Sequence, residues 1–459
     1  MTVAPRDSQD GLEWDIGLFC PEPHWTREPS ISAIESVSRQ HLNIPSEHLC
    51  SVAFFAAGVF NKLYRVDYAG QSLIMRLSLP VYPHHKTRGE VATLRWLRLN
   101  STAPVPKVVA FDDCNDNEIG FEWILMELMP GFPAQQRWRT MSMEKKVALT
   151  GRIAEIQAEL FYHEKLDSSS FSGIGTLHAS TKGKKAEVPT PVAPGRLVAH
   201  EFFLAGRVNY DVPRGPFHSS SAWLESMIKI LILEQTAVVE KAQDDDDKED
   251  AEAILLSARR LLSILPKVFP DTEENCVEPT VLWHDDLNLN NMLVDEEGDL
   301  TAIVDWECVS LLPIWMTTNM PRFLQGENRS EEPTPDEYSD ETPEGSTDSG
   351  HGSDLDKLDN EGKNSLYWMD MMEYDATKLR EVYKARLREL WPGWPLQDRA
   401  GGIATGTLRR RSKWREYQHP ASCGRNRQLC SLESGRAKAQ LAGIPRDGLT
   451  ARPGSAPCI

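Results

Sequence analysis

The chain contains 459 residues, of which 40% are hydrophobic, and its formal net charge at pH 7 is −18. This length and apolar content predict one large folded unit, because no internal repeat divides the sequence into modules. The eight cysteines lie at irregular spacings, and we expect them to be reduced because the sequence shows no signal peptide.

Membrane and export signals are not evident in the sequence. The longest apolar run, around residues 227–233, contains Lys229 and is too short to span a bilayer. Asp7, Asp10 and Asp15 make the first residues acidic, unlike a secretory or mitochondrial presequence. We therefore expect a cytoplasmic protein without a membrane partner.

The first turn of interest lies between two predicted strands, residues 52–55 and 62–66. The connection, residues 56–61, contains Gly58 and ends at Asn61. Glycine lets the backbone approach a ligand closely, and the N–H groups of such a turn can surround a phosphate. A single glycine is a weak signal for such a site.

A charged residue interrupts the next predicted strand, residues 72–77. Arg76 has apolar neighbours there, and a charge inside a strand needs a partner. Glu90, near the start of a predicted helix, is the candidate. The pair could hold a cation against phosphates, or it could be a surface ion pair worth about 0–1 kcal/mol. Spacing alone does not decide between these alternatives.

A strand and a break in regular structure follow. Residues 105–108 restart an extended segment, because proline disfavours helix in the residue before it. Residues 123–127 are typical of a buried strand and lead to residues 128–131. That segment ends in Pro130 and Gly131, which suit a hinge between two lobes.

Helical spacing dominates the second half of the chain. Apolar residues recur with this spacing over residues 146–163, 254–265 and 379–390, which predicts core helices. Residues 223–239 are apolar on most sides, which predicts a central helix. The aspartates at 244–247 are expected to form a solvated loop.

The most specific pattern begins after His284. Two short apolar runs, residues 292–294 and 300–304, are joined by a turn and predict a hairpin. The hairpin would bring Asp305 back beside the loop that holds Asp286 and Asn291.

Asp286 would then face an incoming hydroxyl group while Asn291 and Asp305 converge on one cation. Transfer of a phosphoryl group from a magnesium-bound nucleotide needs this arrangement. A loop cap at Asp286 and a turn residue at Asp305 would explain each residue alone. They do not explain both together.

From about Phe54 to Trp315, and again from Leu379 to Trp394, the chain resembles the aminoglycoside phosphotransferase and choline kinase group of kinase-like enzymes, specifically its fungal members. The resemblance implies an α+β, protein-kinase-like fold of two lobes. A small antiparallel sheet with one helix would form the N-lobe, above a mostly helical C-lobe. ATP with Mg²⁺ would bind between the lobes.

The resemblance also implies roles for individual residues. In it Asp286 is the catalytic base with His284 beside it, and Asn291 and Asp305 are the Mg²⁺ ligands. The implied nucleotide-binding residues are Gly58 and Asn61 of the phosphate loop, Arg76 with its partner Glu90, and the backbone of Met126, Glu127 and Leu128 at the adenine. One departure is Asp285, where the group usually carries glycine; this third carboxylate could repel the charge of Asp286 or point to solvent.

Two segments differ in composition from the rest. Residues 327–364 are acidic and almost without apolar residues, so we expect disorder there. From residue 401 the chain turns basic. A nucleic-acid-binding arm and a misread exon boundary are alternative explanations of this change in composition. We expect no nucleic-acid partner. The predicted units are an N-terminal extension (1–45), the N-lobe (46–130), the C-lobe (131–325), an acidic insert (326–364), a C-terminal helix (365–396) and a basic tail (397–459).

Three functions remain open on sequence alone. The first is an ATP-dependent phosphotransferase acting on a hydroxyl of a small amine or sugar, and the negative net charge weakly favours a cationic acceptor. The second is a nucleotide-binding pseudokinase scaffold, but the chain retains Asp286, Asn291 and Asp305. The third is a protein kinase, but that class has a glycine after the metal-binding aspartate, whereas Trp306 and Glu307 follow Asp305 here. The sequence predicts no oligomeric state.

Overall fold

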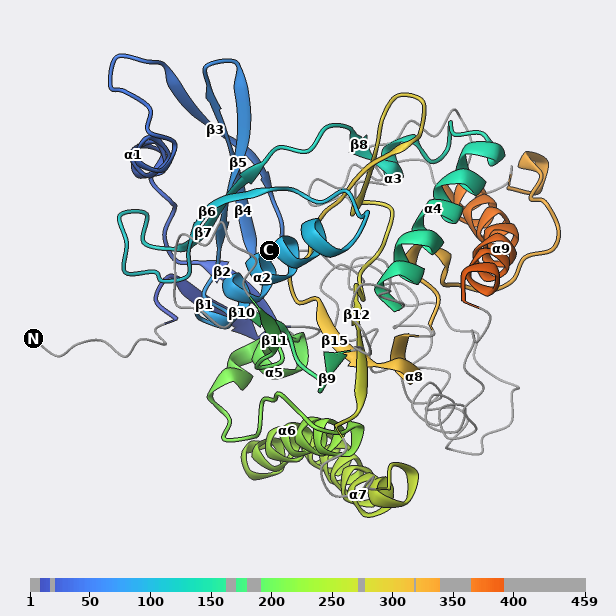
Figure 1. Ribbon diagram of the computed structural model, residues 1–459. Helices are drawn as coiled ribbons and strands as arrows, with labels where there is room; N and C mark the ends of the chain where they lie inside the picture. Colours follow the sequence, from blue (N-terminus) through green and yellow to red (C-terminus); the bar gives the residue numbers. More distant parts are fainter. Residues whose placement is uncertain are drawn as a thin grey trace, which may run out of the picture.

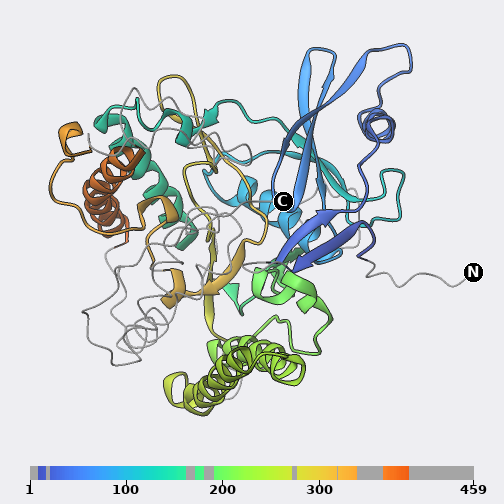
Figure 2. The ribbon, with the colours of Figure 1, turned by 180° about the vertical axis from the view of Figure 1, so that it is seen from behind.

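The computed structural model describes residues 9–16, 21–161, 171–179, 191–270, 277–317, 319–338 and 365–391. Two lobes face each other, with the main sheet on one side and helices α4 and α9 on the other (Figure 1; Figure 2 shows the reverse side). The predicted α+β, two-lobed kinase-like fold is confirmed.

The N-lobe is built on a five-stranded antiparallel sheet with strand order β3-β4-β5-β7-β6. Its strands are β3 (Cys50–Ala57), β4 (Asn61–Tyr68), β5 (Gln71–Ser78), β6 (Val108–Asp112) and β7 (Glu122–Glu127). Four of them match the predicted strands. The extended segment expected at 105–108 becomes a strand only from Val108.

Helix α2 (His85–Asn100) packs beside this sheet and begins in an unusual way. Its N-cap residue His84 has φ +63° and makes no side-chain cap. Glu122, from strand β7, instead accepts the N–H of His84 at 2.6 Å and the hydroxyl of Thr87. A carboxylate at a helix N-terminus satisfies free N–H groups and complements the helix dipole. The start of α2 is therefore fixed to the sheet.

The N-terminal extension forms structure that we did not predict. It contains the hairpin β1 (Leu12–Ile16) and β2 (Pro21–Trp25), followed by helix α1 (Ile31–Leu42). The ring of Trp25 lies 4.8 Å from that of Phe121, and Ile34 of α1 is fully buried in the N-lobe core. The extension is thus packed onto the N-lobe.

The C-lobe core lies between α4 (Met143–Phe161), α9 (Ser365–Leu390) and the strands around the loop that holds Asp286 and Asn291. We call this loop, residues 284–291, the catalytic loop. Ile153, Leu379 and Tyr383 are fully buried in it, as the helical spacing predicted. The other described elements are α3 (Ala134–Arg137), α5 (His200–Phe203), η1 (Leu204–Asn209), α8 (Ile314–Thr317), η2 (Arg322–Leu324), η3 (Pro335–Tyr338), β8 (Phe132–Pro133), β9 (Phe171–Ser172), β10 (Leu177–Ala179), β11 (Val192–Pro194), β12 (Pro279–Trp283), β13 (Met292–Val294), β14 (Leu300–Ile303) and β15 (Ser310–Pro313).

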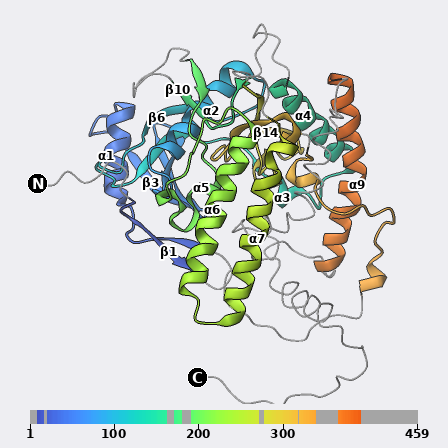
Figure 3. The same ribbon diagram turned by 90° about the horizontal axis from the view of Figure 1, so that it is seen from below.

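The prediction of a central helix at 223–239 is wrong. That segment lies in α6 (Ser220–Lys241), which runs beside α7 (Asp245–Val268) in a helical hairpin (Figure 3) at the lower edge of the molecule in Figure 1. The predicted loop at 244–247 is also wrong. Asp244 caps α7 by accepting the N–H of Asp246, and three aspartates occupy the first turn, where the helix dipole favours negative charge.

The expected disorder of the acidic insert is wrong for its first part. Residues 327–338 lie along α9, where Arg329 pairs with Asp370 at 3.0 Å and Tyr338 donates to the same carboxylate. The remainder of the insert, 339–364, and the basic tail lie outside the described residues. Among the helices that the structure describes, none is long and apolar enough to cross a membrane.

Candidate active site

The hairpin of β13 and β14 brings the two predicted metal ligands together. Met292 pairs with Ile303, and the N–H of Val304 donates to the carbonyl of Asn291 at 2.9 Å. Asn291 at the start of β13 therefore lies beside the chain that leads from β14 into Asp305. This is the convergence that the apolar runs predicted.

Asp286 is held in the loop between β12 and β13. The side-chain amide of Asn291 donates to the Asp286 carbonyl at 2.8 Å and to its Oδ2 at 3.3 Å. Because the nitrogen of Asn291 is engaged in this way, its Oδ1 is the end left for a cation. The other carboxylate oxygen of Asp286 accepts a 2.9 Å hydrogen bond from Arg322, and the Asp286 side chain remains 33% exposed.

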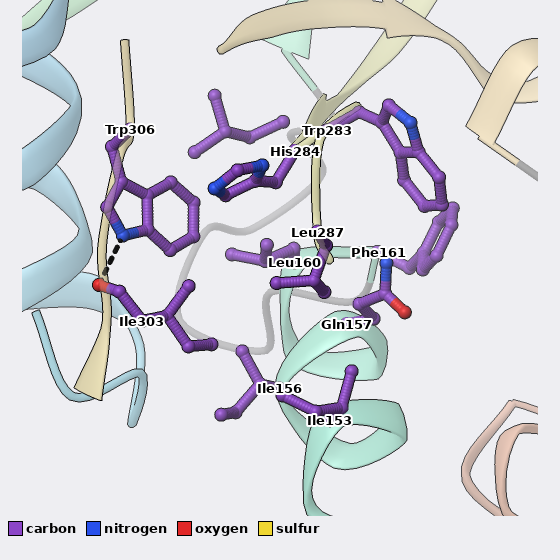
Figure 4. Close-up of a pocket in the computed structure, with 11 residues that line it drawn as sticks. Ile153, Ile156, Gln157, Leu160, Phe161, Trp283, His284, Leu287, Ile303 and Trp306 are labelled. Carbon is purple, nitrogen blue, oxygen red and sulfur yellow. Dashed lines mark hydrogen bonds between the residues drawn. The ribbon is translucent and has the colours of Figure 1, made fainter. Parts of the chain in front are cut away.

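His284 is buried beneath this loop. Its Nε2 is 3.3 Å from the carbonyl of Val304, and its ring meets the edge of Trp306 at 4.8 Å. Both rings border an apolar pocket of about 10 Å³ between α4 and the end of β12 (Figure 4). Burial lowers the pKa of His284, which disfavours the charged form of the ring. His284 thus supports the chain that enters Asp305.

Arg76 and Glu90 form a buried pair, which excludes the surface alternative. Arg76 donates to Glu90 at 2.5 Å, and both side chains are almost fully buried. Arg76 also reaches across the lobes to Asp305 at 3.1 Å and Glu307 at 2.6 Å. Its Nε is buried without a partner among the described residues.

Lys86 adds a second buried cation that we did not predict. Its Nζ lies 2.5 Å from Glu307 and donates to the Asn61 side-chain oxygen at 2.9 Å. Glu307 in turn accepts from the Asn61 amide at 2.9 Å. Lys86 stands four residues before Glu90, on the same face of α2, and this spacing was the available signal. We call Arg76, Lys86, Glu90, Asp305 and Glu307 the interlobe charge cluster.

The three carboxylates of this cluster share two cations unequally. Burial would raise the pKa of Glu307, but Lys86 and Arg76 outweigh it and hold that pKa at about 2. Burial raises the pKa of Glu90 to about 7 despite Arg76. Burial and the Glu307 charge also raise the pKa of Asp305. Glu307 is therefore the carboxylate that the cations keep ionised, and a further cation would favour ionised Asp305.

The predicted phosphate loop is the tight turn from β3 to β4. The N–H of Gly58 donates to the Asn61 carbonyl at 2.9 Å, while the Asn61 side chain turns inward to the cluster. A Cβ built on Gly58 would meet nothing within 4 Å, so packing does not require glycine there. Phe54 and Val59 are exposed around the turn.

The predicted hinge, residues 128–131, connects the N-lobe sheet to the segment that pairs with the β13–β14 hairpin. A Cβ at Gly131, which has φ +106°, would lie 2.5 Å from the hydroxyl of Thr301. Thr301 itself donates to the Pro130 carbonyl at 2.6 Å. Of the predicted adenine-facing residues, Glu127 already donates its N–H to the Lys107 carbonyl at 3.0 Å, and Met126 pairs with Ile74 in the sheet.

The donor set at Asn291 and Asp305 fits Mg²⁺. The described residues hold no group of three or more His, Cys, Asp or Glu that would bind a metal unaided. Mg²⁺ takes oxygen ligands and is commonly held by one or two protein groups together with substrate phosphates. One carboxylate and one carboxamide oxygen meet that requirement.

The two-lobed, kinase-like fold and a match to one family of sequences define the class of protein to which this chain belongs. The sequence matches the profile of the phosphotransferase enzyme family (APH) over residues 51–316, more than half of the chain. The chain belongs to this family. The matched region begins in β3 and ends in α8, so it contains the interlobe charge cluster and the catalytic loop.

Curated relatives are distant and longer than the matched region. A subtelomeric hrmA-associated cluster protein of Aspergillus fumigatus is 25% identical over 313 residues, which cover 59% of this chain and 60% of the relative. Altered inheritance of mitochondria protein 9 of Candida glabrata is 22% identical over 388 residues, 70% of this chain and 58% of the relative. The chain thus spans about 60% of the length of the curated relatives that it matches.

Similar solved structures include aminoglycoside phosphotransferase APH(4)-Ia. That chain is 13% identical, with a TM-score of 0.37, and the alignment covers 63% of this chain and 75% of the other. The GDP and kanamycin complex of APH(2")-IIia is 13% identical with a TM-score of 0.38, covering 88% and 99%.

Proposed function

We propose that this protein is an ATP-dependent phosphotransferase that transfers a phosphoryl group to a hydroxyl of a small molecule. The arrangement of Asp286, Asn291 and Asp305 carries the proposal. Asn291 spans the site, because its amide nitrogen holds Asp286 and its oxygen remains for a cation. One side chain would thereby fix the base and the metal relative to each other.

Each residue has a distinct part in this proposal. Asp286 accepts the proton of the acceptor hydroxyl, for which its exposed position suits it. Asn291 and Asp305 would hold Mg²⁺, which neutralises the charge that develops on the phosphates. Arg76 provides a cation for the nucleotide phosphates, the Gly58 turn covers them, and the backbone of residues 126–128 faces adenine. Phosphoryl transfer depends mainly on such positioning and charge stabilisation.

ADP release with a panel of hydroxylated amines, sugars and hydroxy acids tests the proposal. Purified wild-type protein with ATP and Mg²⁺ should release ADP above its acceptor-free rate with at least one compound, and phosphate should appear on that compound. Nucleotide binding without transfer to any member of the panel would favour the pseudokinase scaffold. Transfer only to protein substrates would favour a protein kinase.

A further inference from the structure

A cation occupies the acceptor side of the candidate base. Arg322 reaches Asp286 from the short helix η2 and donates through Nη1 to Oδ1 at 2.9 Å. An acceptor hydroxyl must approach the same carboxylate if Asp286 acts as the base. Any acceptor therefore binds in contact with, or directly beside, this guanidinium.

The two residues that follow Arg322 anchor the backbone to two different parts of the C-lobe. The N–H of Phe323 donates to the Leu287 carbonyl in the catalytic loop at 3.1 Å. The carbonyl of Leu324 accepts from the buried Arg380 of α9 at 2.6 Å. These two bonds fix η2 to the catalytic loop and to the C-lobe core. The position of Arg322 beside Asp286 is therefore set by the fold and does not depend on its side-chain ion pair.

The guanidinium has donors left over. Its Nη1 bonds to Asp286, whereas Nε and Nη2 have no hydrogen-bond partner within the part of the chain that the structure describes. The side chain is 28% exposed, so a ligand can reach it. Two adjacent N–H groups of arginine match the oxygens of a carboxylate or phosphate, which they bind as a fork. An ammonium group in the same place would be repelled.

We propose that Arg322 binds an anionic group of the acceptor, so that the substrate is a hydroxylated carboxylate or phosphate ester. This inference rests on the proposed phosphotransferase function and narrows its acceptor class. It differs from the cationic acceptor that the net charge of the whole chain favours. The local charge beside the base decides acceptor choice, because it acts at contact distance, whereas long-range steering is screened by salt. An amine elsewhere on the acceptor remains compatible.

Equilibrium binding of three compounds with one carbon skeleton provides the test. Glycerol 3-phosphate, glycerol and 3-amino-1,2-propanediol are titrated into the full-length protein with Mg²⁺ and a non-hydrolysable ATP analogue, by calorimetry. The wild type should bind the phosphate compound most tightly. Arg322→Gln should weaken that binding on the order of ten- to hundredfold, the usual effect of losing a charge-assisted hydrogen bond, and leave glycerol unchanged. Arg322→Lys keeps the charge but not the pair of adjacent N–H groups, so its affinity for glycerol 3-phosphate should lie between those of the wild type and Arg322→Gln.

The control is Arg386→Gln, which removes a partly exposed arginine of α9 that pairs with Glu155 of α4. It should bind all three compounds as the wild type does. Tightest binding of the amino compound by the wild type, equal binding of all three, or an equal loss for all three in Arg322→Gln would overturn the inference. Turnover is measured separately by ADP release. Anion binding that depends on Arg322 without ADP release would contradict the proposed function while leaving the acceptor site in place.

Discussion

The two sides of the candidate site are built differently. On the nucleotide side, the interlobe charge cluster joins β5 and α2 of the N-lobe to the loop after β14 through buried contacts; Arg76 and Lys86 are 5% and 1% exposed. On the acceptor side, Asp286 and Arg322 are 33% and 28% exposed and share a single ion pair. Arg76, Lys86, Glu90 and Glu307 thus form a closed network, whereas Asp305, which is 39% exposed, and the acceptor-side pair are open to a ligand.

This difference separates stability from activity. A buried charge that loses its partner remains desolvated, so a change in the cluster should affect folding first. An exposed charge regains water, so a change at Asp286 should affect the reaction and leave folding almost intact. Substitutions of the same chemical type on the two sides can therefore test the comparison.

The largest effect is expected on the acceptor side. Asp286→Asn keeps the shape of the side chain and removes the base, so turnover should fall on the order of 10² to 10⁴-fold, the usual value of a positioned general base. The melting temperature should stay near that of the wild type. ADP release under saturating ATP measures the rate.

The adjacent carboxylate is the matched control for this change. Asp285→Asn should retain most of the wild-type turnover. If Asp286→Asn is as active as the wild type while Asp285→Asn is not, the base has been assigned to the wrong residue.

On the nucleotide side, Lys86→Met should destabilise the protein. It removes the amine that contacts Glu307 and Asn61, so the buried carboxylate of Glu307 loses one of its two cations, which costs on the order of 3 kcal/mol of unfolding free energy. Lys145→Met removes an exposed pair with Asp299 and should leave the unfolding free energy close to that of the wild type. Urea denaturation measures the unfolding free energy of both variants. Equal stabilities would show that the cluster is not a closed network.

The smallest of the three effects concerns pH and the anchoring of α2. Burial raises the pKa of Glu122 to about 7, although Thr87 and the His84 N–H oppose this. The unfolded chain releases this proton near the ordinary carboxyl pKa, so the contribution to stability is complete below that value and is lost as pH rises to about 7.

Glu122→Gln should therefore remove part of the fall in stability between about pH 4.5 and 7, on the order of 1–3 kcal/mol. Glu127→Gln, at the exposed end of the same strand, is the control. Thermal unfolding across this pH range provides the measurement. An unchanged slope in Glu122→Gln would mean that Glu122 does not take up a proton in the folded state.

Local patterns in the sequence predicted the site better than they predicted its surroundings. The runs at 292–294 and 300–304 were enough to place Asp305 beside Asn291, because a hairpin is a short-range structure. Lys86 and Glu307 were missed because their contact joins residues more than two hundred positions apart. The spacing of apolar residues along the sequence does not indicate a contact between residues so far apart. Arg322 was missed for the same reason, since η2 meets the catalytic loop only in the folded chain.

The errors in the fold have a related cause. Residues 223–239 are apolar enough for a central helix, but α7 covers one face of α6, and Leu233 and Val238 stay exposed. Composition describes how apolar a helix is and not which partner buries it. The aspartates at 244–247 favour a loop by composition, yet as a cap and first turn they stabilise a helix start.

Nucleotide affinity with and without Mg²⁺ tests the central claim most directly. Asp305→Asn and Asp286→Asn are compared with the wild type by calorimetric titration of a non-hydrolysable ATP analogue. If Asp305 holds the metal and Asp286 serves the acceptor, Mg²⁺ should strengthen binding in the wild type and in Asp286→Asn, and much less in Asp305→Asn. Equal dependence on Mg²⁺ in all three proteins would contradict the account.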